Sequence, residues 1–174
     1  MRKLLIVIDM QNDFIDGSLG TEEALGIVEN VKDKIWQYPP GDIIATMDTH
    51  EADYLTTQEG QKLPVEHCIR GTEGWKIRED IAVLLTEAEV YEKPTFGSVQ
   101  MAEDLRDFFC GEECEIELIG LCTDICVVSN ALLLKAYMPE TRISVDASCC
   151  AGVTPEKHLA ALETMRSYQI EVKG

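Results

Sequence analysis

The chain has 174 residues and a formal net charge of −17, from 32 acidic and 15 basic residues. This charge argues against binding to a nucleic-acid backbone or an anionic membrane surface, because both need clustered lysine and arginine. Hydrophobic residues make up 45% of the chain and charged residues 27%, which is ordinary for a soluble globular protein. The length predicts one domain, residues 1–174, with a core of its own.

The first residues, "MRKLLIVIDM", predict a β-strand over residues 3–8. A signal peptide is not expected, because Asp9 interrupts the apolar run and no cleavage site of small residues follows. The later apolar stretch from Ile125 to Leu134 spans ten residues, whereas crossing a bilayer takes roughly 20. Seven cysteines are an odd number, which favours reduced thiols and a location in the cytoplasm over a disulfide framework.

Short runs rich in β-forming residues recur at 3–8, 42–47, 88–93, 115–121, 142–147 and 168–172. Between them, apolar residues recur at the spacing of one helix face. These stripes are Ala24, Ile27, Val28, Val31 and Ile35; Ile77, Ile81, Leu84, Leu85 and Ala88; Met101, Leu105, Phe108 and Phe109 behind Ser98; and Leu159, Leu162 and Met165 behind Thr154-Pro155. The alternation predicts an α/β fold of three layers, α/β/α, with a mostly parallel six-stranded sheet.

Reactive side chains stand where four of the predicted strands end. Asp9 follows the first strand, Asp48 the second and Lys93 the third. The fourth strand ends at Gly120, just before "LCTDIC". In a parallel sheet ligands bind beyond the carboxyl ends of the strands. We therefore expect two acids, a lysine and a thiol at one edge.

The first helical turn after the fourth predicted strand contains Cys126, the stronger of two candidate nucleophiles. With Thr123 or Asp124 as N-cap, the free N–H groups of this turn favour a thiolate and can hold an oxyanion. Lys93 would lower the pKa of the thiol further, and Asp9 could accept its proton. Most free cysteines are small buried hydrophobic residues, and spacing alone leaves that interpretation open.

Three motifs, "VIDMQNDF", the lysine of "YEKPTF" and "IGLCTDICV", occur in this order along the chain. Together they resemble the isochorismatase-like cysteine hydrolases, the nicotinamidase group in particular, over nearly the whole length. The resemblance implies a catalytic triad of Asp9, Lys93 and Cys126. It also implies a cis peptide bond between Leu121 and Cys122, which directs the backbone amides of Cys122 and Cys126 into an oxyanion hole.

Two of the three histidines lie in one loop. Asp48 and His50 are two residues apart, so they face the same side of an extended backbone. Taken alone, this pattern also fits an acidic surface loop with incidental histidines. The loop resembles the metal-binding stretch of nicotinamidases, which implies Asp48, His50 and His67 as ligands and Glu59 as a secondary candidate. Such ligands suit Zn²⁺ first, and also Fe²⁺ or Mn²⁺. The third histidine, His158, is predicted to pack in the core.

The resemblance implies hydrolysis of a small carboxamide through a thioester, with nicotinamide as the first candidate substrate. Phe14 matches an aromatic residue of the family's substrate pocket, and Phe96 is a further predicted pocket residue. One position departs from the family pattern: Pro64 stands where an aromatic residue usually stacks on the pyridine ring. Phe96 or Trp75 is the expected replacement for that ring.

Alternatives to this function stay open at the level of the sequence. The substrate could be another small amide, carbamoyl or pyrazinamide-like. The protein could instead be a thiol redox protein that uses Cys122 and Cys126, or a binding domain that keeps only the metal loop. A small-molecule substrate is the expected partner, without nucleic acid or membrane, and a homo-oligomer is an open alternative.

Overall fold

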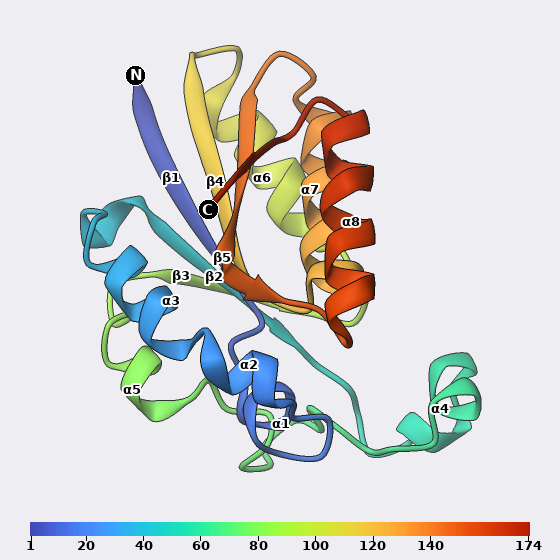
Figure 1. Ribbon diagram of the computed structural model, residues 1–174. Coiled ribbons are helices and arrows are strands. Elements are labelled where there is room, and N and C mark those ends of the chain that lie inside the picture. The colour runs from blue at the N-terminus through green and yellow to red at the C-terminus, as the bar shows by residue number, and fades with distance from the viewer.

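The computed structural model describes residues 1–174. Six strands form one parallel sheet in the order β3-β2-β1-β4-β5-β6 (Figure 1). The strands are β1 Arg2–Ile8, β2 Ile43–Asp48, β3 Glu89–Lys93, β4 Cys114–Leu121, β5 Arg142–Ala151 and β6 Glu171–Lys173. The chain winds from β1 outward to β3, and then from β4 outward to β6. The carboxyl ends of β1 and β4 therefore border the point where winding reverses, which is where open α/β sheets bind ligands.

Helices cover both faces of this sheet. One face carries α6 Val99–Phe109, α7 Val128–Tyr137 and α8 Pro155–Ser167 (Figure 1). The other carries α1 Asn12–Ile15, α2 Glu22–Gly26, α3 Val28–Ile35 and α5 Glu79–Ala82. A short helix, α4 Gln58–Lys62, stands away from the sheet with the 3₁₀ turn Tyr54–Thr56, and a second 3₁₀ turn, Pro40–Asp42, precedes β2. The predicted three-layer fold class is confirmed.

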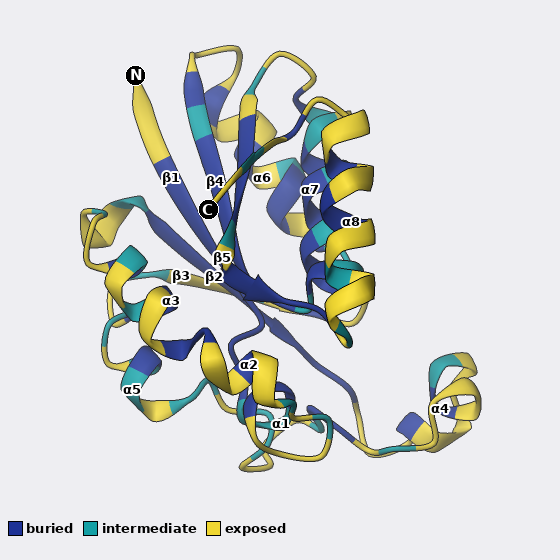
Figure 2. Cartoon of the chain, viewed as in Figure 1, coloured by how far each residue is buried: buried dark blue, intermediate teal, exposed yellow.

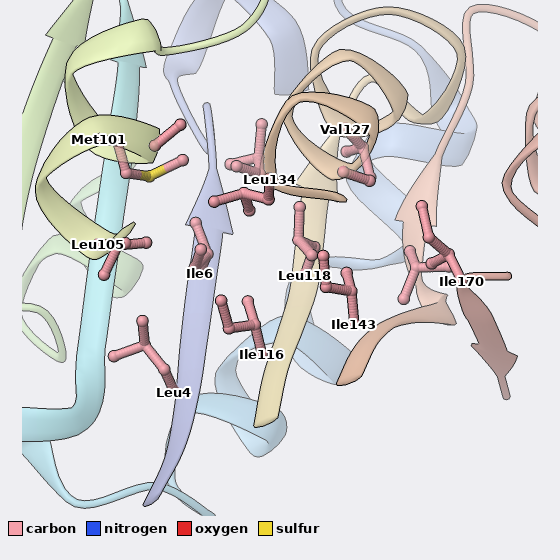
Figure 3. Close-up of a cluster of buried hydrophobic side chains, with 14 of the residues drawn as sticks. Leu4, Ile6, Met101, Leu105, Ile116, Leu118, Val127, Leu134, Ile143 and Ile170 are labelled. Carbon is pink, nitrogen blue, oxygen red and sulfur yellow. The ribbon is translucent and has the colours of Figure 1, made fainter. Parts of the chain in front are cut away.

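The strands contribute to two cores because alternate side chains point to opposite faces. On β1, Leu4, Ile6 and Ile8 join a cluster of 22 buried residues under α6, α7 and α8 (Figure 3). Leu5 and Val7 join a second cluster of 19 buried residues under α3. Burial follows the layers, with strand interiors buried and the outer helix faces exposed (Figure 2). Each such aliphatic side chain contributes about 1.5–3 kcal/mol on full burial.

The predicted helix between residues 77 and 88 is wrong in its length. Only α5 is helical there, over four residues. Ile81 and Leu85 are buried, but the chain continues in tight turns, with hydrogen bonds from Leu84 N to Ile81 O and from Leu85 N to Ala82 O. The apolar spacing correctly identified the side chains that pack in the core. It overestimated the length of the helix that carries them.

Other boundaries and stripe members also differ from the prediction. Strand β5 extends to Ala151, and β6 begins only at Glu171, because Gln169 takes a left-handed φ of 63° after α8. Phe108 and Leu159 are 65% and 64% exposed, since each lies at the margin of its stripe. None of the helices combines the length and apolar character that crossing a bilayer requires.

Candidate active site and metal centre

The candidate nucleophile follows the end of β4. The peptide bond between Leu121 and Cys122 is cis. At Gly120, with φ of 116°, an added Cβ would lie 2.1 Å from the carbonyl oxygen of Ile8, so only glycine lets β4 approach β1 this closely. A π-helical turn, Thr123–Val127, comes next and leads directly into α7. This turn carries Cys126, which is 4% exposed.

The predicted N-cap of this turn is wrong. Cys122 holds the N-cap position, without a side-chain cap. Asp124 Oδ1 instead accepts a hydrogen bond from Val153 N at 2.9 Å, and Thr123 Oγ1 lies 2.8 Å from His158 Nδ1. Both contacts join the turn to the segment that begins α8. The half-buried His158 is therefore a partner of Thr123, and its predicted place in the core is wrong.

Side chains from three strand ends meet around the Cys126 sulfur. Lys93, the last residue of β3, donates to Cys126 Sγ at 3.4 Å. Its Nζ lies 2.7 Å from Asp9 Oδ2 and 3.5 Å from Asp48 Oδ1. Thr46 Oγ1 donates to the other oxygen of Asp9 at 2.7 Å. The structure thus brings together the three side chains, Asp9, Lys93 and Cys126, that the sequence selects for catalysis.

The electrostatics of this cluster set the protonation of the sulfur. Burial raises the pKa of the Cys126 thiol well above its ordinary value, the nearby Asp9 raises it further, and Lys93 offsets only part of this. This direction runs against the thiolate that the sequence leads us to expect in the free protein. Burial also raises the pKa of Asp9, despite the neighbouring ammonium. A carboxylate with a raised pKa is a better acceptor for the thiol proton.

Three ligand atoms converge beside this cluster. His50 Nε2 and His67 Nε2 lie 3.0 and 3.7 Å from Asp48 Oδ2, and the three groups' ligand atoms lie within 4.8 Å of one another. His50 Nε2 is buried, and its contact with Asp48 Oδ2 is not aligned as a hydrogen bond. The Nδ1–H of His67 donates to Val65 O at 2.9 Å, which leaves its Nε2 lone pair free for an ion. These donors fit a divalent cation such as Zn²⁺.

The negative charge of the loop also favours a cation. Burial alone would lower the pKa of His50, but Asp48 and Glu59 outweigh burial and raise it. Glu59 Oε1 lies 3.7 and 3.8 Å from the Nε2 atoms of His50 and His67. Glu59 thus lies next to the three candidate ligands, Asp48, His50 and His67, but is not one of this close group.

Two supporting residues escaped the sequence analysis. Gln11 holds the end of β2, because its Nε2 donates to Asp48 O and Trp75 O, both at 2.8 Å, and its Oε1 accepts from Asp48 N at 2.7 Å. Tyr54 is 0% exposed, and its ring lies 4.7 and 5.0 Å from the two imidazole rings. Its hydroxyl donates to Leu63 O at 2.9 Å. A polar residue three positions after the end of a buried strand was the available signal for Gln11.

A cavity of about 420 Å³ opens onto Cys126 and onto Asp48 and His67, two of the candidate metal ligands. Both aromatic residues predicted for the substrate pocket, Phe14 and Phe96, line it. The Phe14 ring lies 5.6 Å from the ring of His67. The remaining wall residues are Leu19, Asp48, Gln58, Glu59, Lys62, Leu63, Pro94, Thr95, Cys122 and Ile125.

Trp75 does not form part of this cavity. Its indole N–H donates to Thr49 Oγ1 at 3.0 Å, and the residue lines a different surface pocket. Pro64 is exposed and is also absent from the cavity, whereas its neighbour Leu63 lines it. The aromatic surface of the cavity therefore comes from Phe14 and Phe96, and the expectation for Trp75 is wrong.

The fold and the site define the class of protein. The family model of the Isochorismatase domain matches residues 3–173. The chain therefore belongs to the isochorismatase family of hydrolases.

Individual relatives carry more specific names. The chain is 27% identical to the nicotinamidase/pyrazinamidase of Mycobacterium tuberculosis, over 98% of this chain and 97% of that protein. It is similar to the crystal structure of the nicotinamidase/pyrazinamidase PncA from Bacillus subtilis, with a TM-score of 0.84, 29% identity and all of both chains covered. The pyrazinamidase of Pyrococcus horikoshii in complex with zinc gives a TM-score of 0.78 at 25% identity, over 99% of this chain and 98% of that chain.

Proposed function

We propose that this protein is a metal-dependent cysteine amidohydrolase that converts nicotinamide to nicotinate and ammonia. One observation carries the proposal: at the cavity, Cys126 Sγ lies 3.4 Å from Lys93 Nζ, which in turn lies 2.7 Å from Asp9 Oδ2. The names of the similar proteins support a pyridine or pyrazine carboxamide as substrate. Phe14 and Phe96 offer apolar ring faces to such a substrate.

The first half-reaction forms a thioester. As the amide carbon approaches Cys126, Asp9 accepts the thiol proton and the sulfur bonds to that carbon. The carbonyl electron pair moves to oxygen, where the backbone N–H groups of Cys122 and Cys126 stabilise the negative charge. The C–N bond then breaks, and Asp9 gives its proton to the departing ammonia. Lys93 remains an ammonium, which holds Asp9 and the sulfur together.

The second half-reaction releases the acid. Water attacks the thioester carbon while Asp9 accepts a proton from it, and the C–S bond breaks as the sulfur regains a proton. Asp48, His50 and His67 would hold a divalent ion at the side of the cavity. When bound, such an ion supplies a Lewis-acid site for a ring nitrogen or a water molecule.

Replacement of the sulfur tests the proposal directly. We expect Cys126→Ala to lower ammonia release from nicotinamide by about 10⁴-fold or more, as the loss of a nucleophile does in other hydrolases. The matched control is Cys149→Ala, which removes another buried thiol that does not line the cavity and should retain turnover. Parallel assays with pyrazinamide and a carbamoyl amino acid define the substrate. Turnover by Cys126→Ala at the wild-type rate would contradict the proposed nucleophile.

The thiols bear on the alternative redox function and on location. Burial raises the pKa of Cys122 to about 12, which leaves this thiol little thiolate for disulfide exchange with Cys126, whereas hydrolysis needs only the backbone N–H of Cys122. This supports hydrolysis over redox chemistry. All seven cysteines are free, and we propose the cytoplasm as their location, because thiols stay reduced there.

A further inference from the structure

A buried amide side chain lies one helical turn after the nucleophile. Asn130 is in α7 and is 0% exposed, inside the apolar run from Ile125 to Leu134. A buried amide is costly unless its polar atoms are hydrogen-bonded. Its partners therefore indicate what the fold gains by keeping it.

Asn130 joins two parts of the candidate active site. Its Nδ2 donates to the carbonyl oxygen of Cys126 at 2.8 Å and to that of Phe96 at 3.2 Å. Its Oδ1 accepts from the backbone N–H of Ser98 at 2.9 Å. One side chain thus bonds the turn that carries the sulfur to the loop that follows Lys93.

This loop, residues 94–98, forms a wall of the cavity through Pro94, Thr95 and Phe96. It sits tightly against α7, because a Cβ added at Gly97 would lie 3.3 Å from Ser129 O. Phe96 itself is 47% exposed, so few side-chain contacts hold its ring in place. The bonds from Asn130 are the polar attachment of the loop to α7.

We propose that Asn130 is a positioning residue with two separable effects. Its bond to Cys126 O holds the sulfur within reach of Lys93, and its bonds to Phe96 O and Ser98 N hold the aromatic wall of the cavity. The second effect rests on the proposed function, since it concerns substrate binding. The first concerns the sulfur alone and can be measured without turnover.

Two variants separate the effects. Asn130→Ala removes all three hydrogen bonds. Asn130→Thr keeps a hydroxyl that can donate to the carbonyl four residues earlier, which is Cys126 O, and loses both bonds to the loop. Leu134→Ala is the matched control, because Leu134 is a fully buried residue one turn further along α7 and lies outside the cavity.

Three quantities are measured for each variant: the rate at which iodoacetamide alkylates Cys126, located by mass spectrometry; kcat and KM for ammonia release; and the thermal unfolding midpoint. We expect Asn130→Ala to slow alkylation and to lower kcat by about 10- to 100-fold, as small displacements of reacting groups do, and to raise KM. Asn130→Thr should restore alkylation and kcat while KM stays raised. Leu134→Ala should lower the midpoint and leave alkylation and kcat unchanged.

Two results would overturn the inference. One is an Asn130→Ala protein that, like Leu134→Ala, changes only in its midpoint. The other is an Asn130→Thr protein that is alkylated as slowly as Asn130→Ala. If Asn130→Ala does not fold, Asn130→Asp replaces it, since it keeps the size and the acceptor and loses both N–H donors. If the wild type releases no ammonia from any carboxamide, the proposed function fails, while the alkylation rates still decide the role of Asn130.

Discussion

Two clusters of paired charges lie on the same sheet, and their hydrogen bonding differs. The structural ion cluster lies under α3 and consists of Lys34, Glu117, Asp146 and Lys173. Lys34 Nζ lies 2.7 Å from Asp146 Oδ2 and 3.4 Å from Glu117 Oε2. Lys173 Nζ donates to Glu117 Oε1 at 3.2 Å, and Tyr38 donates to Glu117 Oε2 at 2.7 Å. Two positive charges balance two negative ones.

The cluster at the strand ends is incomplete by comparison. There Lys93 faces both Asp9 and Asp48. Asp9 Oδ2 faces the Lys93 ammonium at 2.7 Å and His50 Nε2 faces Asp48 Oδ2 at 3.0 Å, but neither contact is aligned as a hydrogen bond. Native proteins leave few such atoms, and each needs a reason, such as a catalytic role or a bound ion. The comparison indicates that complete pairing serves stability and that incomplete pairing marks the functional site.

The largest effect should follow from removing the proton acceptor. We expect Asp9→Asn to lower kcat for ammonia release by about 10³-fold, because general acid–base catalysis contributes roughly 10²–10⁴-fold. The matched change in the structural ion cluster, Asp146→Asn, should lower the unfolding midpoint and leave kcat unchanged. Steady-state assays and thermal unfolding of both variants provide the measurement. Equal losses of kcat in the two variants would erase the distinction between the clusters.

Removal of a candidate ligand should affect metal content next. We expect His50→Ala to weaken Zn²⁺ binding by at least about 10- to 100-fold, the loss that even outer partners of a metal site produce. His158→Ala is the control, since His158 contacts Thr123 and not the ligand group. Metal analysis after dialysis against a weak chelator gives the stoichiometry. Full zinc retention by His50→Ala would exclude His50 as a ligand.

A smaller effect is expected from Lys34→Met. It removes the ion-pair partner of Asp146, and we expect the free energy of unfolding to fall by about 2–3 kcal/mol, below the usual range for a buried pair because Ser148 still donates two hydrogen bonds to Asp146 Oδ1. Urea unfolding measures this loss, and kcat should stay at the wild-type value. Adding Asp146→Leu should restore part of the stability, because the unpaired charge is then gone. A double variant less stable than Lys34→Met would contradict this account.

The smallest effect is a pH dependence of stability. Burial would raise the pKa of Glu117 and Asp146, but hydrogen bonds from Tyr38 and Lys34, respectively, help to lower them below their ordinary 4.5 and 3.8. Carboxylates with lowered pKa values stabilise the folded state above their unfolded pKa, and this contribution is lost as the pH falls through the folded value. The unfolding midpoint should therefore drop below about pH 4. The drop should be smaller in Lys34→Met, because Glu117 and Asp146 then lose the ammonium group that helps to lower their pKa values.

The sequence predicted the layers and the strand ends well, because apolar runs and their interruption by Asp9, Asp48 and Lys93 are local features. It failed where the outcome depends on distant partners. The ionisation of Cys126 depends on burial that no local pattern reports. Asn130 appears in the sequence only as a polar residue in an apolar run, since its loop partners lie 32 and 34 residues away.

The order of the strands leaves β3 and β6 at the two edges of the sheet. Exposed Glu89 and Glu92 lie on β3, whereas β6 has only three residues, of which Glu171 and Lys173 are both exposed. Like charges placed opposite each other destabilise pairing between strands, and short charged edges resist the addition of further strands. Copies of this chain that met β3 to β3 would set the carboxylates of Glu89 and Glu92 against one another, so the acidic side chains of this edge oppose the addition of a second sheet.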